Sequence, residues 1–454
     1  MDYGLNTNNP KMSPSTSPYP QIQFLQRQAA SLLLYQSVLQ TDVGIAFLEL
    51  LQTIRYAEAD ARSTLQAYGN YFHALATRKQ NWEDYLISQI LIAENPFSKL
   101  TQQQDLEAIP PALIAAARHD LQVLQSLHEC SSAVLCEWVQ AVAHLPISPV
   151  VWYTEQDDVG LEAGSFLHHL DNWADAVEEL AAYYQKFGTG LFAQYHALRW
   201  QEGEFIGIPY PDPVKLSSLV GYESQQEALL KNTQFLLAGQ TALHVLLYGS
   251  RGAGKSSLVK ALLNEYSHRQ LRLLEVAKSD LKDLPKIVEQ LRGVPQKFII
   301  FVDDLSFEED DDAFKALKVV LEGNLTARPQ NVVVYATTNR RHLIREFFAD
   351  RPSLKNNEEV HAWDTMQEKL SFSDRFGLTL TFDTADQNTY LQIVRHLAAQ
   401  AEIDINQEDL EYQALQWATR HNGRSGRTAR QFIDFLKADT TLFGTNNKIS
   451  DTQI

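Results

Sequence analysis

The sequence predicts an α/β domain built on a five-stranded parallel sheet, with an all-α domain before it and a helical segment after it. Beyond residue 208, short apolar runs alternate with helical segments, which is typical of a parallel sheet covered on both faces. Before residue 204, apolar residues recur at helical spacing. A chain of 454 residues is too long for one core, so two or three domains are expected.

The N-terminal part is expected to be helical over residues 21–204, after a disordered segment, 1–20, rich in Asn, Ser, Thr and Pro. One helix is predicted to start at Asn81, which can cap it with Asp84 three residues later. It is expected to continue through Asn95 and to stop at Pro96.

A second helix is predicted from an apolar stripe that repeats at alternating steps of four and three and ends near Gly188. The stripe consists of Phe166, Leu170, Trp173, Val177, Leu180 and Tyr184. We interpret it as part of the core of a helical bundle. The alternative is a docking face for a partner protein.

The stretch from Ile208 to Pro213 holds three prolines in six residues and predicts a stiff connector between domains. Five apolar runs beyond it are the predicted strands. They are Val245–Tyr248, Leu271–Val276, Phe298–Val302, Val332–Tyr335 and Leu378–Phe382. From about Asp386 the pattern is helical again.

A glycine-rich loop follows the first of these runs and precedes a helical segment. With the residue after it, the loop reads Gly249, Ser250, Arg251, Gly252, Ala253, Gly254, Lys255, Ser256 and Ser257. Glycines let the backbone curl until its N–H groups point at an anion, and the helix N-terminus adds its positive dipole end. The pattern predicts a phosphate-binding loop, with Lys255 on the outer phosphates of ATP and Ser256 on Mg²⁺. The alternative is a turn that binds nothing.

Polar residues end the next two predicted strands. Asp303 and Asp304 come directly after 298–302, and Asn339 ends the segment 331–339. Ligands of open α/β sheets bind at this end of the strands. We expect Asp303 to hold Mg²⁺ and Asp304 to orient or deprotonate the attacking water. Asn339, with Thr338 as the weaker candidate, is expected to contact the γ-phosphate or the water.

Each of these assignments has a simpler alternative. An acidic run continues over 308–312, so a solvated acidic turn would also account for the two carboxylates. For Asn339 the alternative is an ordinary turn at the end of a strand.

These motifs, in this order, resemble Walker A, Walker B and sensor 1 of the AAA+ ATPases. Ser373–Gly377 resembles the segment with the arginine finger, and 423–430 resembles the sensor 2 region. The resemblance implies that Arg375 reaches the γ-phosphate bound by a neighbouring subunit. It also implies that Arg427, in preference to Arg430, contacts the γ-phosphate in the same chain.

Further upstream, Val220 and Gly221 lie in a segment that resembles the one packing on adenine. The sequences of the motifs over about 207–440 are similar to those of the bacterial family known as domain of unknown function 815. The similarity rests on short motifs such as Asp-Asp-Leu-Ser-Phe-Glu and Ser-Asp-Arg-Phe-Gly.

The resemblance implies an AAA+ type P-loop NTPase fold with a C-terminal helical lid. The predicted domains are a disordered N-terminus (1–20), an all-helical domain (21–204), an α/β nucleotide-binding domain (205–384), the lid (385–440) and a flexible tail (441–454).

Two departures from the AAA+ pattern bear on function. Most AAA+ proteins have Glu where this chain has Asp304, so the shorter side chain predicts slow hydrolysis, and Glu308 could substitute only if the turn folds back. AAA+ translocases carry an aromatic loop after the second strand, whereas residues 277–285 contain no aromatic residue. This weakens any assignment as an unfoldase.

Composition narrows the classes of function. Acidic residues outnumber basic ones by 56 to 39, and the net charge of −17 argues against nucleic acid as the partner. Two cysteines in so long a chain indicate a reducing compartment. No apolar run approaches the length of a membrane span. We therefore expect a cytoplasmic protein.

The leading prediction is a Mg²⁺-dependent ATPase that uses hydrolysis to remodel or switch a partner. We expect a homo-oligomer in which Arg375 acts in trans, and an unidentified protein partner bound through the helical domain. The alternative is an ATP-binding scaffold that hydrolyses slowly or not at all. A nucleic-acid loader or motor, suggested by the basic residues Arg340, Arg341 and Arg345, is the third possibility.

Overall fold

The computed structural model describes residues 18–56, 61–153, 165–306, 312–322, 328–339, 375–421 and 423–443. The chain divides into two compact units, with the boundary between Gly190 and Leu191, inside α10 (Gly190–Gln194). Residues 1–17 of the predicted disordered segment lie outside the described part. Its predicted end at residue 20 is wrong, because the first helix begins at Tyr19.

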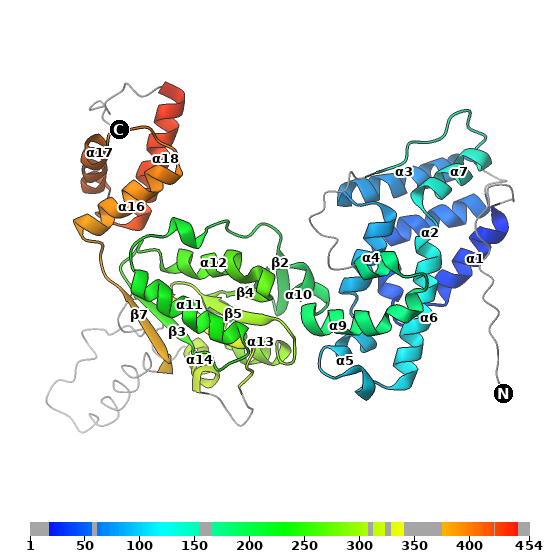
Figure 1. Ribbon diagram of the computed structural model, residues 1–454, viewed down its shortest axis with the longest axis horizontal. Helices are drawn as coiled ribbons and strands as arrows, with labels where there is room; N and C mark the ends of the chain where they lie inside the picture. Colours follow the sequence, from blue (N-terminus) through cyan, green and yellow to red (C-terminus); the bar gives the residue numbers. More distant parts are fainter. Residues whose placement is uncertain are drawn as a thin grey trace. The chain divides into compact units, whose positions relative to one another are not determined.

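The N-terminal unit consists of helices wherever the structure describes it (Figure 1). The α-helices are α1 (Tyr19–Ala30), α2 (Asp42–Arg55), α3 (Ala61–Arg78), α4 (Trp82–Ile92), α5 (Pro96–Thr101), α6 (Pro111–His128), α7 (Ser132–Val142), α8 (Ser165–His169) and α9 (Val177–Phe187). The 3₁₀ turns are η1 (Gln36–Leu39), η2 (Leu106–Ala108) and η4 (Trp173–Ala176).

The predicted start of α4 is confirmed, because the Asn81 side chain accepts a hydrogen bond from the Asp84 N–H at 2.7 Å. The predicted end is too late. The helix ends at Ile92, because Asn95 adopts an extended conformation and caps α5, with Pro96 as its first residue. Proline at this first position is compatible with a helix start.

The apolar stripe after residue 165 does not lie on one helix. α8 ends at His169, and the Asn172 side chain then caps η4, which leads into α9. The prediction of one continuous helix is therefore wrong, because Asn172 satisfies a backbone N–H in the middle of the stripe. The end near Gly188 is confirmed, since Gly188 has a φ of 70° and follows α9 directly. The stripe packs in the hydrophobic core of the unit, as predicted.

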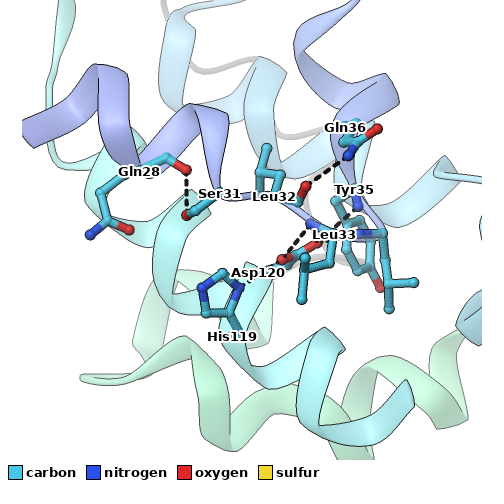
Figure 2. Close-up of polar contacts among 9 residues, drawn as sticks. Gln28, Ser31, Leu32, Leu33, Tyr35, Gln36, His119 and Asp120 are labelled. Carbon is cyan, nitrogen blue, oxygen red and sulfur yellow. Dashed lines mark hydrogen bonds and ion pairs between the residues drawn. The ribbon is translucent and has the colours of Figure 1, made fainter. Parts of the chain in front are cut away.

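A buried carboxylate fixes the turn that follows α1. Asp120, on α6, is fully buried and accepts hydrogen bonds from the backbone N–H groups of Leu33, Leu34 and Tyr35 at 2.7 to 3.0 Å (Figure 2). Nδ1 of the His119 ring contacts Oδ1 of Asp120 at 2.9 Å, an oxygen that also accepts from the Leu33 N–H. Three consecutive amides directed at one anion satisfy a turn that would otherwise bury unpaired donors.

The C-terminal unit contains a seven-stranded sheet in the order β2-β1-β4-β5-β6-β3-β7. The strands are β1 (Ala197–Gln201), β2 (Glu204–Ile208), β3 (Val245–Gly249), β4 (Leu271–Val276), β5 (Lys297–Val302), β6 (Val332–Thr338) and β7 (Leu378–Phe382). All neighbours are parallel except β1 and β2. The five predicted strands are all present. The prediction of a five-stranded sheet is wrong, because the antiparallel hairpin of β1 and β2 adds two strands.

The hairpin also corrects the prediction that residues up to 204 are helical. β1 and β2 are joined by Glu202 and Gly203, both with positive φ, of 54° and 89°. Two consecutive positive φ values make the tight turn whose twist matches that of the strands it joins. β1 then pairs with β4 and so extends the parallel sheet.

Helices cover both faces of the sheet (Figure 1). Successive residues of a strand point to opposite faces. Phe298 and Ile300 accordingly pack with α13 (Leu284–Gln290) and α14 (Asp312–Glu322). Ile299 packs on the other face, with α11 (Glu223–Leu237) and α12 (Lys255–Tyr266). The remaining turns are η5 (Leu216–Ser218), η6 (Ser267–Arg269) and η7 (Lys278–Asp283).

Three helices after the sheet have a hydrophobic core of their own. They are α16 (Gln387–Gln400), α17 (Gln407–Arg420) and α18 (Gly426–Phe443). α16 starts just inside the predicted lid, where Asp386 accepts from the Thr389 N–H at 2.8 Å. α18 continues past residue 440 to Phe443, so the predicted flexible tail begins too early, and 444–454 lie outside the described residues.

Candidate nucleotide-binding site

The glycine-rich loop connects β3 to α12 and depends on glycine at three positions. Gly249, Gly252 and Gly254 have φ values of 141°, 75° and 89°, which side chains other than hydrogen rarely allow. A Cβ on Gly249 would lie 1.9 Å from the carbonyl oxygen of Phe382. Gly254 precedes Lys255, the first residue of α12, so the loop ends directly at a helix N-terminus.

The ammonium of Lys255 is buried inside this loop, with 6 % of the residue exposed. Its Nζ donates to the carbonyl oxygens of Gly249 and Ser250 at 2.9 and 2.8 Å and to Oδ1 of Asn339 at 3.1 Å. Burial lowers the pKa of Lys255, while the carboxylates of Asp303 and Asp304 act in the opposite direction. The cation is therefore held by oxygen atoms at the edge of the sheet where anions would bind.

Ser256 and Asp303 lie together beside the loop. The Ser256 hydroxyl donates to Oδ1 of Asp303 at 2.6 Å, and Thr337 donates to the same oxygen. Both side chains offer oxygen atoms as metal ligands, and Asp303 is solvent-accessible. Hard cations such as Mg²⁺ prefer such ligands, so the residue pair fits a magnesium site.

Asp304 has an unusual backbone conformation, with a φ of 51°. Its N–H donates to the Thr337 hydroxyl at 3.0 Å and, more weakly, to Oδ1 of Asp303 at 3.2 Å. Its carboxylate accepts from the Asn339 side-chain amide at 2.8 Å. The predicted residues of the second and third motifs are thus joined in one hydrogen-bonded group, which Asn339 connects to Lys255. Glu308, the possible substitute, lies outside the described residues.

The helices after the sheet approach the loop through the start of α18. The Arg427 N–H donates to the carbonyl oxygen of Gly252 at 3.2 Å. Ser425 caps this helix by accepting from the Thr428 N–H at 3.1 Å. A Cβ on Gly426 would lie 3.0 Å from the Gly252 carbonyl oxygen, so a glycine here permits the close approach.

These elements enclose a cavity of about 1170 Å³. Most of the predicted residues line it: Val220, Gly221, Arg251, Gly252, Ala253, Gly254, Lys255, Ser256, Ser257, Asp303, Asp304, Asn339 and Arg427. Arg430, the second choice after Arg427, also lines it. Gly249, Ser250 and Arg375 are described but do not belong to this lining. The first two shape the loop, since the Ser250 N–H donates to the Phe382 carbonyl at 2.9 Å.

Arg375 lies just before β7 and is ion-paired with Glu322, the last residue of α14. Its side chain is 18 % exposed. The structure therefore brings Arg375 to a carboxylate of its own chain rather than to its own cavity.

Sequence reasoning missed some residues of the site. Thr337 donates to the Asp303 carboxylate and accepts from the Asp304 N–H, but the sequence had indicated no role for it. Its neighbour Thr338, the weaker candidate after Asn339, is buried in the same strand, β6. A hydroxyl directly at the end of an apolar run was the available signal. The cavity is also lined by Ile393 and Leu397 of α16 and by residues 212–215, 217 and 218, and nothing in their local sequence indicates this.

Comparison with known proteins gives the family context of this site. Residues 193–440 match the model of a family described as "Protein of unknown function (DUF815)". The match starts earlier than the resemblance read from the sequence, and it includes the β1–β2 hairpin.

Two curated proteins are similar to shorter stretches of the chain. An AAA-ATPase of Arabidopsis thaliana is 28% identical over 154 residues, which cover 31% of this chain and 30% of that protein. Replication factor C large subunit of Sulfolobus acidocaldarius is 32% identical over 122 residues, which cover 24% of this chain and 27% of that protein. The chain therefore spans less than a third of the length of these relatives.

Among solved structures, the RuvB Holliday junction branch migration motor of Thermotoga maritima is similar at 16% identity and a TM-score of 0.32. The match covers 49% of this chain and 72% of RuvB. Separately, no helix in the described ranges combines the length and the apolar character that crossing a bilayer requires.

Proposed function

This chain belongs to the family described as "Protein of unknown function (DUF815)", which is related to the AAA+ ATPases, and from that premise we propose that it hydrolyses ATP to ADP and phosphate. The observation that carries the proposal is the convergence of Lys255, Ser256, Asp303, Asp304 and Asn339 on one cavity. In this proposal the triphosphate binds on the glycine-rich loop. Val220 and Gly221 contact the base.

Each residue has a role that its contacts support. Lys255 neutralises the outer phosphates, exchanging its carbonyl and amide partners for phosphate oxygens. Ser256 and Asp303 hold Mg²⁺, which when bound neutralises charge on the phosphates. Asp304 orients the attacking water and accepts its proton, and Asn339 holds that carboxylate in place.

Catalysis in this scheme comes from positioning and from charge neutralisation, because phosphoryl transfer requires little covalent chemistry from the protein. Arg427 supplies positive charge from α18, and its N–H already contacts the loop. Arg375 does not line the cavity of its own chain, which supports a role at the cavity of a neighbouring subunit in a homo-oligomer.

We further propose that nucleotide turnover drives remodelling or switching of a protein partner bound by the helical N-terminal unit. Exposed apolar side chains there, among them Ile147, Val150 and Tyr153, support a protein contact. The net charge of −17 argues against nucleic acid as the partner. A cytoplasmic location belongs to the same proposal and is supported by Cys130 and Cys136, which are both buried free thiols.

A second function, a scaffold that binds ATP without turnover, is favoured by one observation. The Asp304 carboxylate is short and already accepts a hydrogen bond from Asn339. A carboxylate held in this way could fail to reach the water. The two functions share nucleotide binding and differ only in phosphate release.

The test is phosphate release and nucleotide binding by the full chain with excess Mg²⁺. The Lys255→Ala variant should bind ATP about 10- to 100-fold more weakly, because a charged hydrogen bond contributes ~1.5–3 kcal/mol. Asp304→Asn should bind ATP normally and release phosphate about 100-fold more slowly or slower still. If the wild-type chain binds no ATP, both functions are wrong. If it binds ATP but releases no phosphate at any protein concentration, the scaffold function holds.

A further inference from the structure

We infer that the hydroxyl of Thr337 is a positioning group that sets both carboxylates of the site, Asp303 and Asp304. The inference rests on the proposed function, because it assigns Thr337 a role in magnesium-dependent turnover. Thr337 lies in the segment 331–339, where the sequence had pointed to Asn339 and Thr338 instead.

The contacts of this hydroxyl use both of its hydrogen-bonding capacities. Thr337 Oγ1 donates to Oδ1 of Asp303 and accepts from the N–H of Asp304 at 3.0 Å. A hydroxyl has one proton and two lone pairs, so it can serve a carboxylate and an amide at once. One side chain thereby ties the side chain of one acidic residue to the backbone of the next.

The position of Thr337 in the sheet makes it a rigid support. It lies in β6, where it pairs with Leu247 of β3, and its own carbonyl accepts from the Leu305 N–H at 2.7 Å. The residue is 2 % exposed. A buried β-branched side chain has few χ1 rotamers, so the hydroxyl is aimed before any ligand arrives.

For Asp303 the consequence is a fixed carboxylate. Oδ1 of Asp303 receives Thr337 Oγ1 together with the Ser256 hydroxyl at 2.6 Å. When Mg²⁺ and nucleotide bind, Ser256 is expected to turn to the metal, and Thr337 is then the side-chain donor that still orients Asp303. Loss of the Thr337 hydroxyl should therefore weaken the magnesium-dependent part of nucleotide binding.

For Asp304 the consequence is a held backbone. A φ of 51° costs a residue with a Cβ about 1–2 kcal/mol, so surrounding contacts must retain it. The Thr337 hydroxyl is the acceptor of the shorter of the two hydrogen bonds that the Asp304 N–H makes. This conformation brings the Asp304 carboxylate to Asn339 at 2.8 Å. Without the hydroxyl, the carboxylate loses its fixed direction.

The experiment compares four full-length variants with the wild type. Thr337→Val removes the hydroxyl at nearly constant volume, Thr337→Ser keeps it, and Thr337→Cys keeps a weaker donor if the valine variant does not fold. The matched control is Thr233→Val, which also removes a fully buried, bonded hydroxyl. The Thr233 hydroxyl contacts Leu229 and Tyr335 in the same unit, and none of these three residues lines the cavity.

Two readouts are measured for each variant. The first is the affinity for a non-hydrolysable ATP analogue with Mg²⁺ and with EDTA. Thr337→Val should lower the magnesium-dependent gain about tenfold, the effect of one lost charged hydrogen bond, and leave the affinity in EDTA unchanged. The second is kcat for ATP, which should fall about 100-fold because a displacement of ~1 Å at the reacting group has this effect.

In both readouts the values should decrease in the order Thr, Ser, Cys and Val at position 337. Thr233→Val should keep the wild-type affinity and kcat despite a lower Tm. The inference is overturned if folded Thr337→Val retains the magnesium-dependent gain, or if Thr233→Val loses as much. If wild type binds the analogue but releases no phosphate, proposed hydrolysis fails, and the magnesium readout still decides the role of Thr337.

Discussion

The guanidinium of Arg375 forms an ion pair with the carboxylate of Glu322 within one chain, and the Arg375 side chain is largely buried against this contact. The pair lies outside the lining of that chain's cavity. An arginine that acts on a neighbouring subunit must leave or extend this contact when subunits assemble.

The first prediction concerns the site at which Arg375 acts. Arg375→Ala should lower kcat of the assembled protein by ~10³-fold or more, as loss of such an arginine does in phosphoryl transfer, and leave ATP affinity nearly unchanged. Mixing Arg375→Ala with Asp304→Asn subunits should restore phosphate release. Some interfaces in the mixture combine an intact Arg375 with an intact Asp304.

The comparison variant for this experiment is Glu322→Gln, which removes the charge of the partner but keeps Arg375. It should hydrolyse ATP at least as fast as wild type in the assembled state. If the mixture is no more active than the separate variants, Arg375 does not act in trans.

The second prediction concerns the length of the residue at 304. Asp304→Glu adds one methylene, which extends the carboxylate beyond its contact with Asn339. We expect kcat to rise, while Asp304→Asn should lose about 100-fold or more because general base assistance contributes ~10²–10⁴-fold. Single-turnover measurements separate this step from product release. A glutamate variant slower than wild type would show that the site is built for aspartate.

The third prediction concerns pH and the buried His244, whose Nδ1 accepts from the Val334 N–H at 2.9 Å. Burial, with a contribution from Arg328, lowers the pKa of His244 to about 3. An unfolded histidine titrates near ~6.5, so the unfolded chain takes up the proton first as the pH falls. The contribution of neutral His244 to stability should be fully present above pH ~6.5. As the pH falls from ~6.5 toward 3, the free energy of unfolding should decrease by up to ~1.4 kcal/mol per pH unit.

The check is denaturant unfolding of the C-terminal unit at several pH values. His244→Asn should be less stable at pH 7 but should lose less stability between pH 6.5 and 4. His268→Asn, at an exposed position, should retain the wild-type slope. Equal slopes in all three proteins would show that His244 is not the group responsible.

The fourth prediction concerns the buried Asp120. Asp120→Ala leaves the N–H groups of Leu33, Leu34 and Tyr35 without their acceptor. The hydrogen bond of the Tyr35 N–H is buried, and those of Leu33 and Leu34 are part-buried. A buried unsatisfied donor costs ~1–3 kcal/mol, so we expect the N-terminal unit to lose about 3 kcal/mol. The substitution should also accelerate hydrogen exchange of these three amides. Glu137→Ala, on the exposed side of α7, should change stability by no more than ~0.5 kcal/mol.

Much of the C-terminal unit was predictable because its signals are local and continuous. The five apolar runs correspond to β3 to β7, since strands buried on both faces carry few polar residues. That Lys255, Asp303 and Asn339 meet at one edge follows from the parallel order of those strands.

The errors have equally specific causes. β1 has only five residues, begins with two buried ones and alternates only after them, so the tight turn at Glu202–Gly203 was its only clear signal. The break before η4 depends on one capping residue, Asn172, inside an otherwise regular stripe. Thr337 was missed because the hydrogen bonds that distinguish it from Thr338 depend on β5, which is distant in sequence.

The β1–β2 hairpin has a consequence for how copies of this protein can meet. β4 would otherwise present an unpaired row of backbone N–H and carbonyl groups, a ready template for strand addition. β1 occupies that row, and the outermost strand on this side becomes the short β2, which runs opposite to its neighbour. A second copy of the chain therefore cannot pair with the backbone of β4, and any contact between copies on this flank would form against the hairpin.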